Sequence, residues 1–297
     1  MNVGTFSEKI YHVFTEGNYS FNLTLLNDWN DSRLVKMNSL IIGRMNNDDL
    51  QKCSKLRNIY IPFTGRNGFD EGFMKEAGIT LHSTNAHSKY VAERGFTLAL
   101  TLLGKITEYD TSLKAGNWSR RNFEDRVSWN TLFEKKVGIY GYGTIGKLIA
   151  NMLTPFSCEL HVYSRSKTDN VNYVDSLEDL VSKTDIIFIS VPLTKETESS
   201  FNKHLLESMH GKFLINIARG KIVNEDALYT ALKNDTLQGY ASDVWYNYPG
   251  SGSDHTPVSK YPLHEENVVM TPHCGGFAHG SEQKRYIDTL NQIESSV

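Results

Sequence analysis

The chain has 297 residues, 39% of them hydrophobic, and a formal net charge of −3 at pH 7. That length suffices for two domains of ordinary size, each with its own core. Acidic and basic residues are mixed along the whole chain, which argues against nucleic acid as a partner. No run approaches the ~20 apolar residues of a membrane helix, and no signal-peptide pattern opens the sequence, so we expect a cytoplasmic protein without membrane contact. Three cysteines without Cys-x-x-Cys spacing predict no metal site.

Short runs rich in β-branched and aromatic residues alternate with longer stretches of helical spacing. This alternation is typical of parallel sheets covered by helices, so it predicts an α/β fold. The expected strands are Ser39–Ile42, Ile59–Pro62, Ile79–His82, Val137–Tyr140, Leu160–Tyr163, Ile186–Val191, Phe213–Ile217, Gly239–Val244 and Val268–Thr271.

A single long helix is expected over Val91–Tyr109, where the apolar residues recur at helical spacing. The polar stretch that follows, Lys114–Asn130, contains Trp118 and Trp129 but has no strand pattern. We therefore expect a first domain of about the first 95 residues and a second domain that opens near Leu132, with the long helix as the hinge.

The segment VGIYGYGTIGKLIA carries a Gly-x-Gly-x-x-Gly pattern between an expected strand and a helix-like stretch. Gly141 permits the tight turn, Gly143 lets backbone amides approach a pyrophosphate, and Gly146 lets the helix pack closely on the strand. The helix N-terminus, with Thr144 and Ile145 in its first turn, adds positive potential. The alternative is a glycine-rich turn with no ligand, but the strand before it and the helix after it favour a dinucleotide site.

The end of the next strand bears on the choice between NAD and NADP. NAD-preferring enzymes place an acidic residue about 20 positions beyond the glycine turn, where it holds the ribose 2′-hydroxyl. This sequence reads Ser164, Arg165 and Ser166 there, with no acid. A serine hydroxyl and a guanidinium suit a 2′-phosphate, which a carboxylate would repel. We therefore expect NADP, with NAD as the other option; an Arg165 that is only solvated, or that stacks on adenine, is the competing interpretation.

Four further motifs follow in the second half of the chain: SVPLTKET over residues 190–197, LINIARGKIVNEDAL over 214–228, GYASDVW over 239–245 and VVMTPHCGG over 268–276. With the glycine turn they resemble the D-isomer-specific 2-hydroxyacid dehydrogenases. The first domain resembles this family more loosely, through IPFTGRNGFD over 61–70 and VAE over 91–93. The resemblance implies an oxidoreductase that uses a nicotinamide cofactor to reduce a small 2-keto acid, similar to glyoxylate or hydroxypyruvate, to the D-2-hydroxy acid.

The resemblance also implies the order of the domains. A Rossmann cofactor domain over residues 96–274 is inserted into a flavodoxin-like substrate domain, which is built from residues 1–95 and from a C-terminal helix within residues 275–297. Both domains are expected to be doubly wound parallel sheets. A homodimer joined through the long helix and the Trp118 arm is implied as well, in keeping with a helix too apolar to be left exposed.

Reduction of a keto acid needs a cation that binds the acid and polarises its carbonyl, and a group that protonates the carbonyl oxygen. Arg219, in Ala-Arg-Gly after an expected strand, matches the cation of the family, and a guanidinium fork suits these oxygens. His273, in Pro-His-x-Gly-Gly, matches the acid/base, and imidazole exchanges protons near neutral pH. The competing interpretations are a surface salt bridge for Arg219 and a structural role for His273.

The resemblance assigns further residues to the cofactor. Asp243, in Ser-Asp-Val-Trp, resembles the residue that binds the nicotinamide carboxamide, and a strand-end cap is its alternative. Pro192, Thr197 and Ala218 are expected beside the cofactor, and Asn216 is a further candidate.

In the first domain, the turn at Gly65, Arg66 and Asn67 resembles the carboxylate-binding turn of the family. Backbone amides of such a turn bind anions, and the Arg66 side chain would add a second cation. A turn that only connects a strand to a helix is an equally favoured interpretation.

One position departs from the family pattern. The family carries a glutamate five residues beyond the aspartate, where it keeps the histidine protonated, but here Tyr248 occupies that place. A tyrosine cannot raise a histidine pKa by charge, although its hydroxyl can hydrogen-bond the ring and so act at the substrate site. The pH optimum of reduction is therefore expected to lie lower, unless another acid such as Glu282 replaces the glutamate.

Three functions remain open from the sequence. The first is the keto-acid reductase described above. The second keeps the fold and the hydride transfer but uses another donor, such as formate or phosphite, because altered partners of the histidine can accompany altered substrates. The third is a non-catalytic nucleotide sensor, which only the missing glutamate favours.

Overall fold

The computed structural model describes residues 1–297 except 67, 119–127, 169–170 and 251–257. The chain folds as two compact units: the first joins Met1–Ser88 to Gly276–Val297, and the second spans Lys89–Gly275.

The first unit is a five-stranded parallel sheet in the order β2-β1-β3-β4-β5. Its strands are β1 (Asn2–Thr5), β2 (Asn22–Leu25), β3 (Ser39–Ile41), β4 (Asn58–Ile61) and β5 (Thr80–Ser83), and its helices are α1 (Glu8–Glu16), α2 (Asn47–Leu50), α3 (Glu71–Glu76) and α10 (Ser281–Glu294). The strand order reverses between β1 and β3, so a ligand crevice is expected at the carboxyl ends of these two strands.

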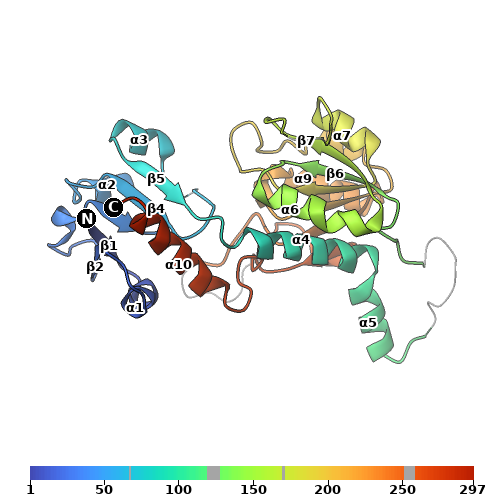
Figure 1. Ribbon diagram of the computed structural model, residues 1–297. Coiled ribbons are helices and arrows are strands. Elements are labelled where there is room, and N and C mark those ends of the chain that lie inside the picture. Colours follow the sequence, from blue (N-terminus) through green and yellow to red (C-terminus); the bar gives the residue numbers. More distant parts are fainter. Residues whose placement is uncertain (67, 119–127, 169–170, 251–257) are drawn as a thin grey trace. The chain divides into compact units, whose positions relative to one another are not determined.

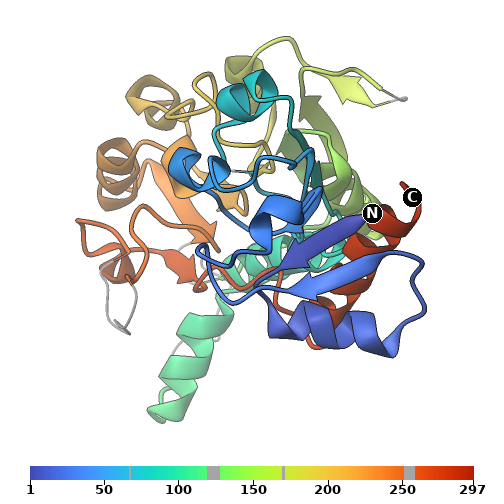
Figure 2. The same cartoon turned by 90° about the vertical axis from the view of Figure 1, so that its left-hand side faces the viewer.

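Helices cover both faces of this sheet. On one face α1 and α10 lie side by side and bury Ile10 and Leu290, and the two termini of the chain lie close together here (Figure 2). On the other face Met74 of α3 packs into a cluster with strand residues. The C-terminal helix α10 is thus an integral part of the first unit, and the Tyr60 hydroxyl lies 2.9 Å from that of Ser296.

The second unit is a seven-stranded parallel sheet in the order β12-β11-β10-β9-β6-β7-β8. Its strands are β6 (Lys136–Tyr140), β7 (Glu159–Tyr163), β8 (Asn172–Tyr173), β9 (Ile186–Ile189), β10 (Lys212–Asn216), β11 (Leu237–Ser242) and β12 (Val268–Met270). Its helices are α4 (Ser88–Leu103), α5 (Ile106–Lys114), α6 (Thr144–Leu153), α7 (Leu177–Lys183), α8 (Lys203–Glu207) and α9 (Glu225–Lys233). The order of the strands reverses between β6 and β9.

Alternate residues of the central strands face opposite layers of this unit. Helices α4 and α6 pack with Ile186 and Phe188 of β9 on one face, whereas α7, α8 and α9 pack with Ile187 and Ile189 on the other (Figure 1). All four residues of β9 are buried, as expected for a strand covered by helices on both faces.

The predicted fold class, two doubly wound parallel sheets with a Rossmann-type second sheet, is confirmed. Each expected strand is present with bounds that differ by at most two residues, but the sequence prediction missed β1, β2 and β8.

The prediction of one helix over Val91–Tyr109 is wrong. The helix ends at Leu103, and α5 begins at Ile106 after Lys105, whose φ of 50° is left-handed. A Cβ on Gly104 would meet the Leu100 carbonyl at 2.8 Å, which suits glycine to this break. In Figure 1 α5 projects away from the sheet of the second unit.

Candidate active site

The glycine turn lies where the order of the second sheet reverses, between β6 and the start of α6. Gly141 has a φ of 95°, which favours glycine, and a Cβ there would meet Val191 at 2.7 Å. The Ser190 hydroxyl, at the end of β9, donates to the Gly141 carbonyl at 2.7 Å and so ties the turn to the neighbouring strand. The turn is therefore fixed by its own contacts at the place where open α/β sheets bind ligands.

The residues of the turn fit a dinucleotide. A Cβ on Gly146 would meet the Gly141 carbonyl at 2.2 Å, so the helix packs on the turn as closely as only glycine permits. A Cβ on Gly143, by contrast, has nothing within 4 Å, so open space lies in front of the backbone there. Thr144 and Ile145 form the first turn of α6, whose N-terminus attracts an anion. This cradle suits a pyrophosphate.

The loop after β7 presents its polar side chains to solvent. Arg165 and Ser166 are exposed, and Ser164 is half-buried. The positive charge of Arg165 helps to lower the pKa of Glu196, whose main cause is a hydrogen bond from Thr194. Arg165 is thus electrostatically coupled to the loop after β9.

Arg219 is placed by a buried bracket at the end of β10. The Asn216 side chain, fully buried, accepts from Ala218 N at 3.0 Å and donates to the Arg219 carbonyl at 3.0 Å. The Arg219 guanidinium in turn donates to the Ala218 carbonyl at 2.6 Å. A Cβ on Gly220 would meet the Trp245 carbonyl at 2.3 Å, so the backbone of the Ala-Arg-Gly turn passes directly against the segment that follows β11.

His273 lies on a short loop after β12, in a left-handed conformation with a φ of 55°. The Asp243 carboxylate, which is 3% exposed, holds this loop on both sides of the histidine. It accepts from the Thr271 hydroxyl at 2.5 Å, from Cys274 N at 3.0 Å and from Gly275 N at 2.7 Å. Asp243 therefore fixes the backbone that carries His273.

Tyr248 packs against His273, with ring centroids 5.4 Å apart. Its hydroxyl accepts a hydrogen bond from Trp245 N at 3.0 Å, and the hydrogen bond to the imidazole stays a prediction. Burial raises the pKa of Tyr248, so this side chain is neutral near pH 7.

The charges around His273 favour its neutral form. Partial burial is the largest cause that lowers its pKa, the positive charge of Arg219 lowers it further, and the negative charge of Asp243 opposes both. Burial also lowers the pKa of Arg219, and Tyr248 opposes that shift. Arg219 is thus close enough for its charge to favour the neutral form of His273.

Other candidate cofactor residues are engaged within the protein. The Thr197 hydroxyl donates to the Pro192 carbonyl at 2.6 Å and accepts from Thr194 N at 2.8 Å, which shapes the loop after β9. Asn216 and Asp243 likewise have their polar atoms occupied, as described above. Asp243 holds the His273 loop through these bonds, and its contact with the nicotinamide stays a prediction.

Glu282, considered as a replacement for the missing glutamate, has partners of its own in the first unit. Its carboxylate pairs with Lys9 at 3.0 Å and accepts from the Tyr286 hydroxyl at 3.0 Å. The hydrogen bond from Lys9 is the largest cause that lowers the pKa of Glu282.

The predicted carboxylate-binding turn follows β4 in the first unit. The Thr64 hydroxyl donates to the Thr84 carbonyl at 3.1 Å, which anchors the start of the turn before Gly65. The Arg66 guanidinium pairs with Glu71 at 3.6 Å, so its charge is partly compensated. Asn67 lies outside the described residues.

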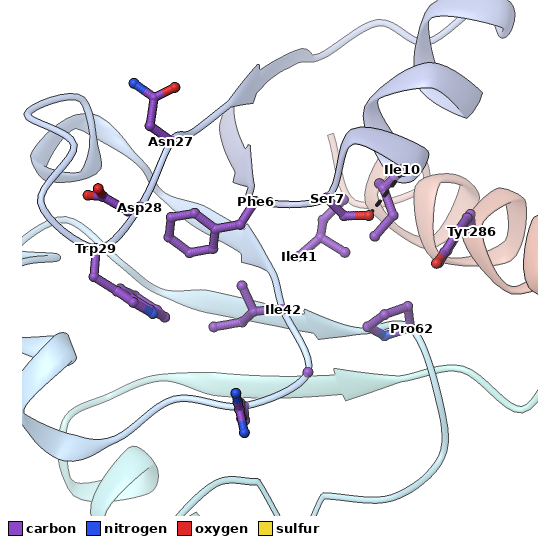
Figure 3. Close-up of a pocket in the computed structure, with 12 residues that line it drawn as sticks. Phe6, Ser7, Ile10, Asn27, Asp28, Trp29, Ile41, Ile42, Pro62 and Tyr286 are labelled. Carbon is purple, nitrogen blue, oxygen red and sulfur yellow. Dashed lines mark hydrogen bonds between the residues drawn. The ribbon is translucent and has the colours of Figure 1, made fainter. Parts of the chain in front are cut away.

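A pocket of about 470 Å³ opens beside this turn, at the carboxyl ends of β1 and β3 (Figure 3). Phe6 and Trp29 form one wall, with ring centroids 4.7 Å apart. Ile41 and Ile42 line it from β3 and its end, and Arg44 adds a cation. This is the reversal point of the first sheet, where α/β folds bind ligands.

Comparison with known proteins bears on the family. Residues 96–275 match the family described as "D-isomer specific 2-hydroxyacid dehydrogenase, NAD binding domain". The chain is 34% identical over 234 residues to glyoxylate/hydroxypyruvate reductase A of Arabidopsis thaliana, an alignment that covers 76% of this chain and 72% of that protein. This chain belongs to the D-isomer specific 2-hydroxyacid dehydrogenase family.

Solved structures extend the likeness to the whole chain. The NAD-dependent formate dehydrogenase of Staphylococcus aureus, in complex with NAD, is 29% identical with a TM-score of 0.76, and the match covers 99% of this chain and 94% of that one. The D-lactate dehydrogenase of Aquifex aeolicus, complexed with NAD and lactic acid, shares the fold with a TM-score of 0.82 at 23% identity, over 100% of this chain and 95% of that one. As a member of this dehydrogenase family, the chain is an NAD(P)-dependent oxidoreductase.

Several residues that shape this dehydrogenase site escaped the sequence reasoning. Ser190, Gly220, Trp245 and Thr271 act through close packing or single hydrogen bonds; the Trp245 indole, for instance, donates to the Thr271 carbonyl at 2.8 Å. Their positions beside the recognised motifs were the available signal, because each directly precedes, follows or lies within two residues of a candidate residue.

Within the part of the chain that the structure describes, no helix combines the length and the apolar character needed to cross a membrane. Likewise, no three His, Cys, Asp or Glu side chains among these residues are grouped so as to hold a metal ion.

Proposed function

We propose that this dehydrogenase reduces a small 2-keto acid to the D-2-hydroxy acid, with NADPH as the preferred hydride donor. The observation that carries the proposal is that Arg219, after β10, and His273, after β12, lie at the same edge of the parallel sheet of the second unit, where the positive charge of Arg219 lowers the pKa of His273. A cation and an acid/base at one place are what carbonyl reduction requires.

In this proposal Arg219 binds and polarises the substrate. Its guanidinium donates hydrogen bonds to the carboxylate and carbonyl oxygens, which makes the carbonyl carbon more electrophilic. The Asn216 bracket and the close approach of Gly220 to Trp245 hold the Arg219 backbone in place before substrate arrives. Such preorganisation spares the cost of ordering the cation during the reaction.

His273 is the proposed general acid. Its imidazolium gives a proton to the carbonyl oxygen, so that a keto acid, one hydride and one proton yield a hydroxy acid. The three hydrogen bonds that Asp243 accepts from Thr271, Cys274 and Gly275 hold the loop of His273. In the reverse direction the neutral imidazole accepts the proton.

The nicotinamide cofactor supplies the hydride when it is bound. The glycine turn is proposed to hold its pyrophosphate, since Gly143 leaves open space before the backbone amides. Ser164, Arg165 and Ser166 are proposed to hold the 2′-phosphate, because they stand where an acid would select NAD. Ala218 and Pro192 are proposed to line the cofactor site, whereas Thr197 and Asp243 shape it through internal bonds.

For the first unit we infer a role in substrate recognition. The turn at Gly65, Arg66 and Asn67 is proposed to bind a carboxylate, with the Arg66 charge moderated by Glu71. The neighbouring pocket, walled by Phe6 and Trp29, is large and apolar enough for an aromatic or branched substituent (Figure 3).

The test is steady-state oxidation of NADPH and NADH by the full chain with glyoxylate, hydroxypyruvate, pyruvate and phenylpyruvate. The proposal predicts turnover of at least one keto acid, with a higher kcat/KM for NADPH than for NADH. Tight NADPH binding without turnover of any of the four would contradict it.

Oxidation of formate is the second candidate. It is favoured by the likeness to the Staphylococcus aureus formate dehydrogenase over 99% of this chain, and by the neutral Tyr248 beside His273, since formate oxidation releases no proton to a base. Reduction of NAD or NADP by formate, with no keto-acid reduction, would select this function instead.

A further inference from the structure

A second pocket adjoins the glycine turn and shares only Ser166 with the residues assigned above to the 2′-phosphate. It measures about 500 Å³ and lies between α6 and the loop after β7. Thr144, Lys147, Leu148 and Asn151 face it from α6, at the i, i+3, i+4, i+7 spacing of one helical face. Ser166 faces it from the loop. The pocket therefore borders the place where the ribose 2′ position is expected, at the end of β7.

Lys147 is the only charged side chain among the described residues that line this pocket. It follows Gly146 directly, so it projects from the first turns of α6. Its ammonium nitrogen lies 5.8 Å from the centroid of the Tyr142 ring, which shows that the side chain reaches back toward the glycine turn. The ammonium thus adds positive potential close to the N-terminus of a ten-residue helix.

Thr168, in the loop opposite Lys147, is held by two hydrogen bonds. The Tyr173 hydroxyl of β8 accepts from Thr168 N at 2.8 Å and donates to the Thr168 carbonyl at 2.5 Å. Ser166 and Thr168 both line the pocket, so two hydroxyl groups stand across from the ammonium. Lys167, which belongs to this loop, pairs with Asp175 at 3.2 Å and does not line the pocket.

Arg165 acts from a different side. Its positive charge acts to lower the pKa of Glu196 in the loop after β9 and that of Tyr140 at the end of β6. Arg165 does not line the α6 pocket. The two cations therefore approach the end of β7 from different elements. A phosphate monoester carries up to two negative charges, so two cations suit it better than one.

We propose that Lys147 is a second specificity-determining cation for the 2′-phosphate of NADPH, acting from α6 while Arg165 acts from the loop after β7, with Ser166 donating between them. This inference rests on the proposed NADPH preference and adds to it a residue outside the β7 loop. An ammonium recognises the phosphate as a point charge and leaves a 2′-hydroxyl almost unaffected.

The test is a binding measurement on the full chain that does not depend on turnover. Dissociation constants are measured by titration calorimetry for NADPH, NADH, adenosine 2′,5′-bisphosphate and AMP, with the wild type, Lys147→Gln, Lys147→Arg and Arg165→Gln. Lys147→Gln is expected to weaken NADPH and the bisphosphate about tenfold, as for loss of one charge-assisted contact, and to change NADH and AMP less than about twofold. Lys147→Arg is expected to keep most of the discrimination.

Lys203→Gln on α8 is the matched control, since it removes the same charge from a helix on the other face of the sheet. Equal weakening of NADPH and NADH by Lys147→Gln, or no change in either, would overturn the inference. A preference for NADPH that Arg165→Gln abolishes and Lys147→Gln retains would contradict this inference alone. A wild type without any preference would contradict the proposed cofactor selectivity and this inference together.

Discussion

His273 has a neutral aromatic neighbour at the place where the family pattern has an acid. Burial and the Arg219 charge lower its pKa, and Asp243 only partly offsets them. Because reduction needs the imidazolium, kcat/KM for keto-acid reduction is expected to be highest at low pH. It should fall as the pH rises through the lowered pKa of His273. The midpoint of that fall should lie below the ordinary histidine pKa of about 6.5.

Tyr248→Glu tests this electrostatic account. A carboxylate in place of the ring that now packs 5.4 Å from the imidazole would stabilise the imidazolium. We expect the falling limb of kcat/KM to move up by about one pH unit, the scale of a single nearby charge. Tyr248→Gln, which has the same length without the charge, is the control; identical pH profiles for the two variants would show that Tyr248 does not face the titrating group.

Asp243→Asn tests the brace beneath His273. An amide has only one acceptor oxygen. Its NH₂ group would face backbone N–H groups whose hydrogen bonds the carboxylate now accepts, so at least one of those bonds would be lost. We expect the free energy of unfolding to fall by about 1–3 kcal/mol without cofactor, together with kcat. Thermal or urea denaturation checks this, with Asp175→Asn at an exposed position as the control. Unchanged stability with weakened cofactor binding would favour the nicotinamide role predicted from the sequence.

At the residue scale, the motifs bring Asp243 and Tyr248 beside the His273 loop in the second unit. The roles of these side chains and of Arg219 toward substrate and cofactor stay predictions, and the bonds that each one makes were not predicted. The bonds of Asp243 could not be predicted, because they depend on how the loop after β12 returns over the end of β11. The hydrogen bond from Trp245 N to the Tyr248 hydroxyl could not be predicted either, because it depends on the local turn between these two residues.

In the glycine turn and helix α6, substitution of two different glycines is expected to distinguish effects on stability from effects on cofactor binding. Gly143→Ala adds a Cβ where no atom lies within 4 Å, so stability should hold while the new methyl intrudes on the pyrophosphate cradle. Gly146→Ala places a Cβ 2.2 Å from the Gly141 carbonyl, so the helix must shift and both stability and binding should fall. We expect both variants to weaken NADPH at least about tenfold.

Calorimetric titration and thermal melts of the two glycine variants distinguish these effects. Equal melting temperatures for Gly146→Ala and the wild type would contradict the close packing of α6 on the turn. NADPH binding unchanged by Gly143→Ala would contradict the cradle.

Among the elements, the strands with long apolar runs were predictable and the short ones were not. β8 has only two residues, and β1 and β2 have four residues each that mix polar and apolar types, so none of the three contains a long apolar run. The break between α4 and α5 was missed because Gly104-Lys105 interrupts a pattern that is apolar on both sides. The left-handed Lys105 has no signature in periodicity.

At the scale of the whole molecule, the end of the second unit near α5 exposes apolar side chains. Ile106 is 57% exposed, Leu113 51% and Trp118 72%, and α5 has no buried residue. Exposed apolar groups gathered on one projecting element are typical of an interface. We therefore infer the homodimer that the family resemblance implies, joined through this arm, and expect light scattering to give twice the chain mass.

Leu113→Lys is expected to shift the protein toward monomers, because it places charge on the apolar face of α5. Lys203→Gln, on a helix remote in sequence, should leave the mass unchanged. A wild-type protein that stays monomeric at micromolar concentration would contradict the inferred dimer.

The central claim is that Arg219 and His273 carry out keto-acid reduction together. The most direct test is single-turnover oxidation of bound NADPH by a keto acid in the wild type, His273→Gln and Arg219→Lys, with NADPH affinity measured in parallel. The account predicts that both variants bind NADPH as the wild type does and lose at least about a hundredfold in the rate of hydride transfer, the usual scale of an acid/base group. Rates within a few-fold of the wild type in either variant would contradict it.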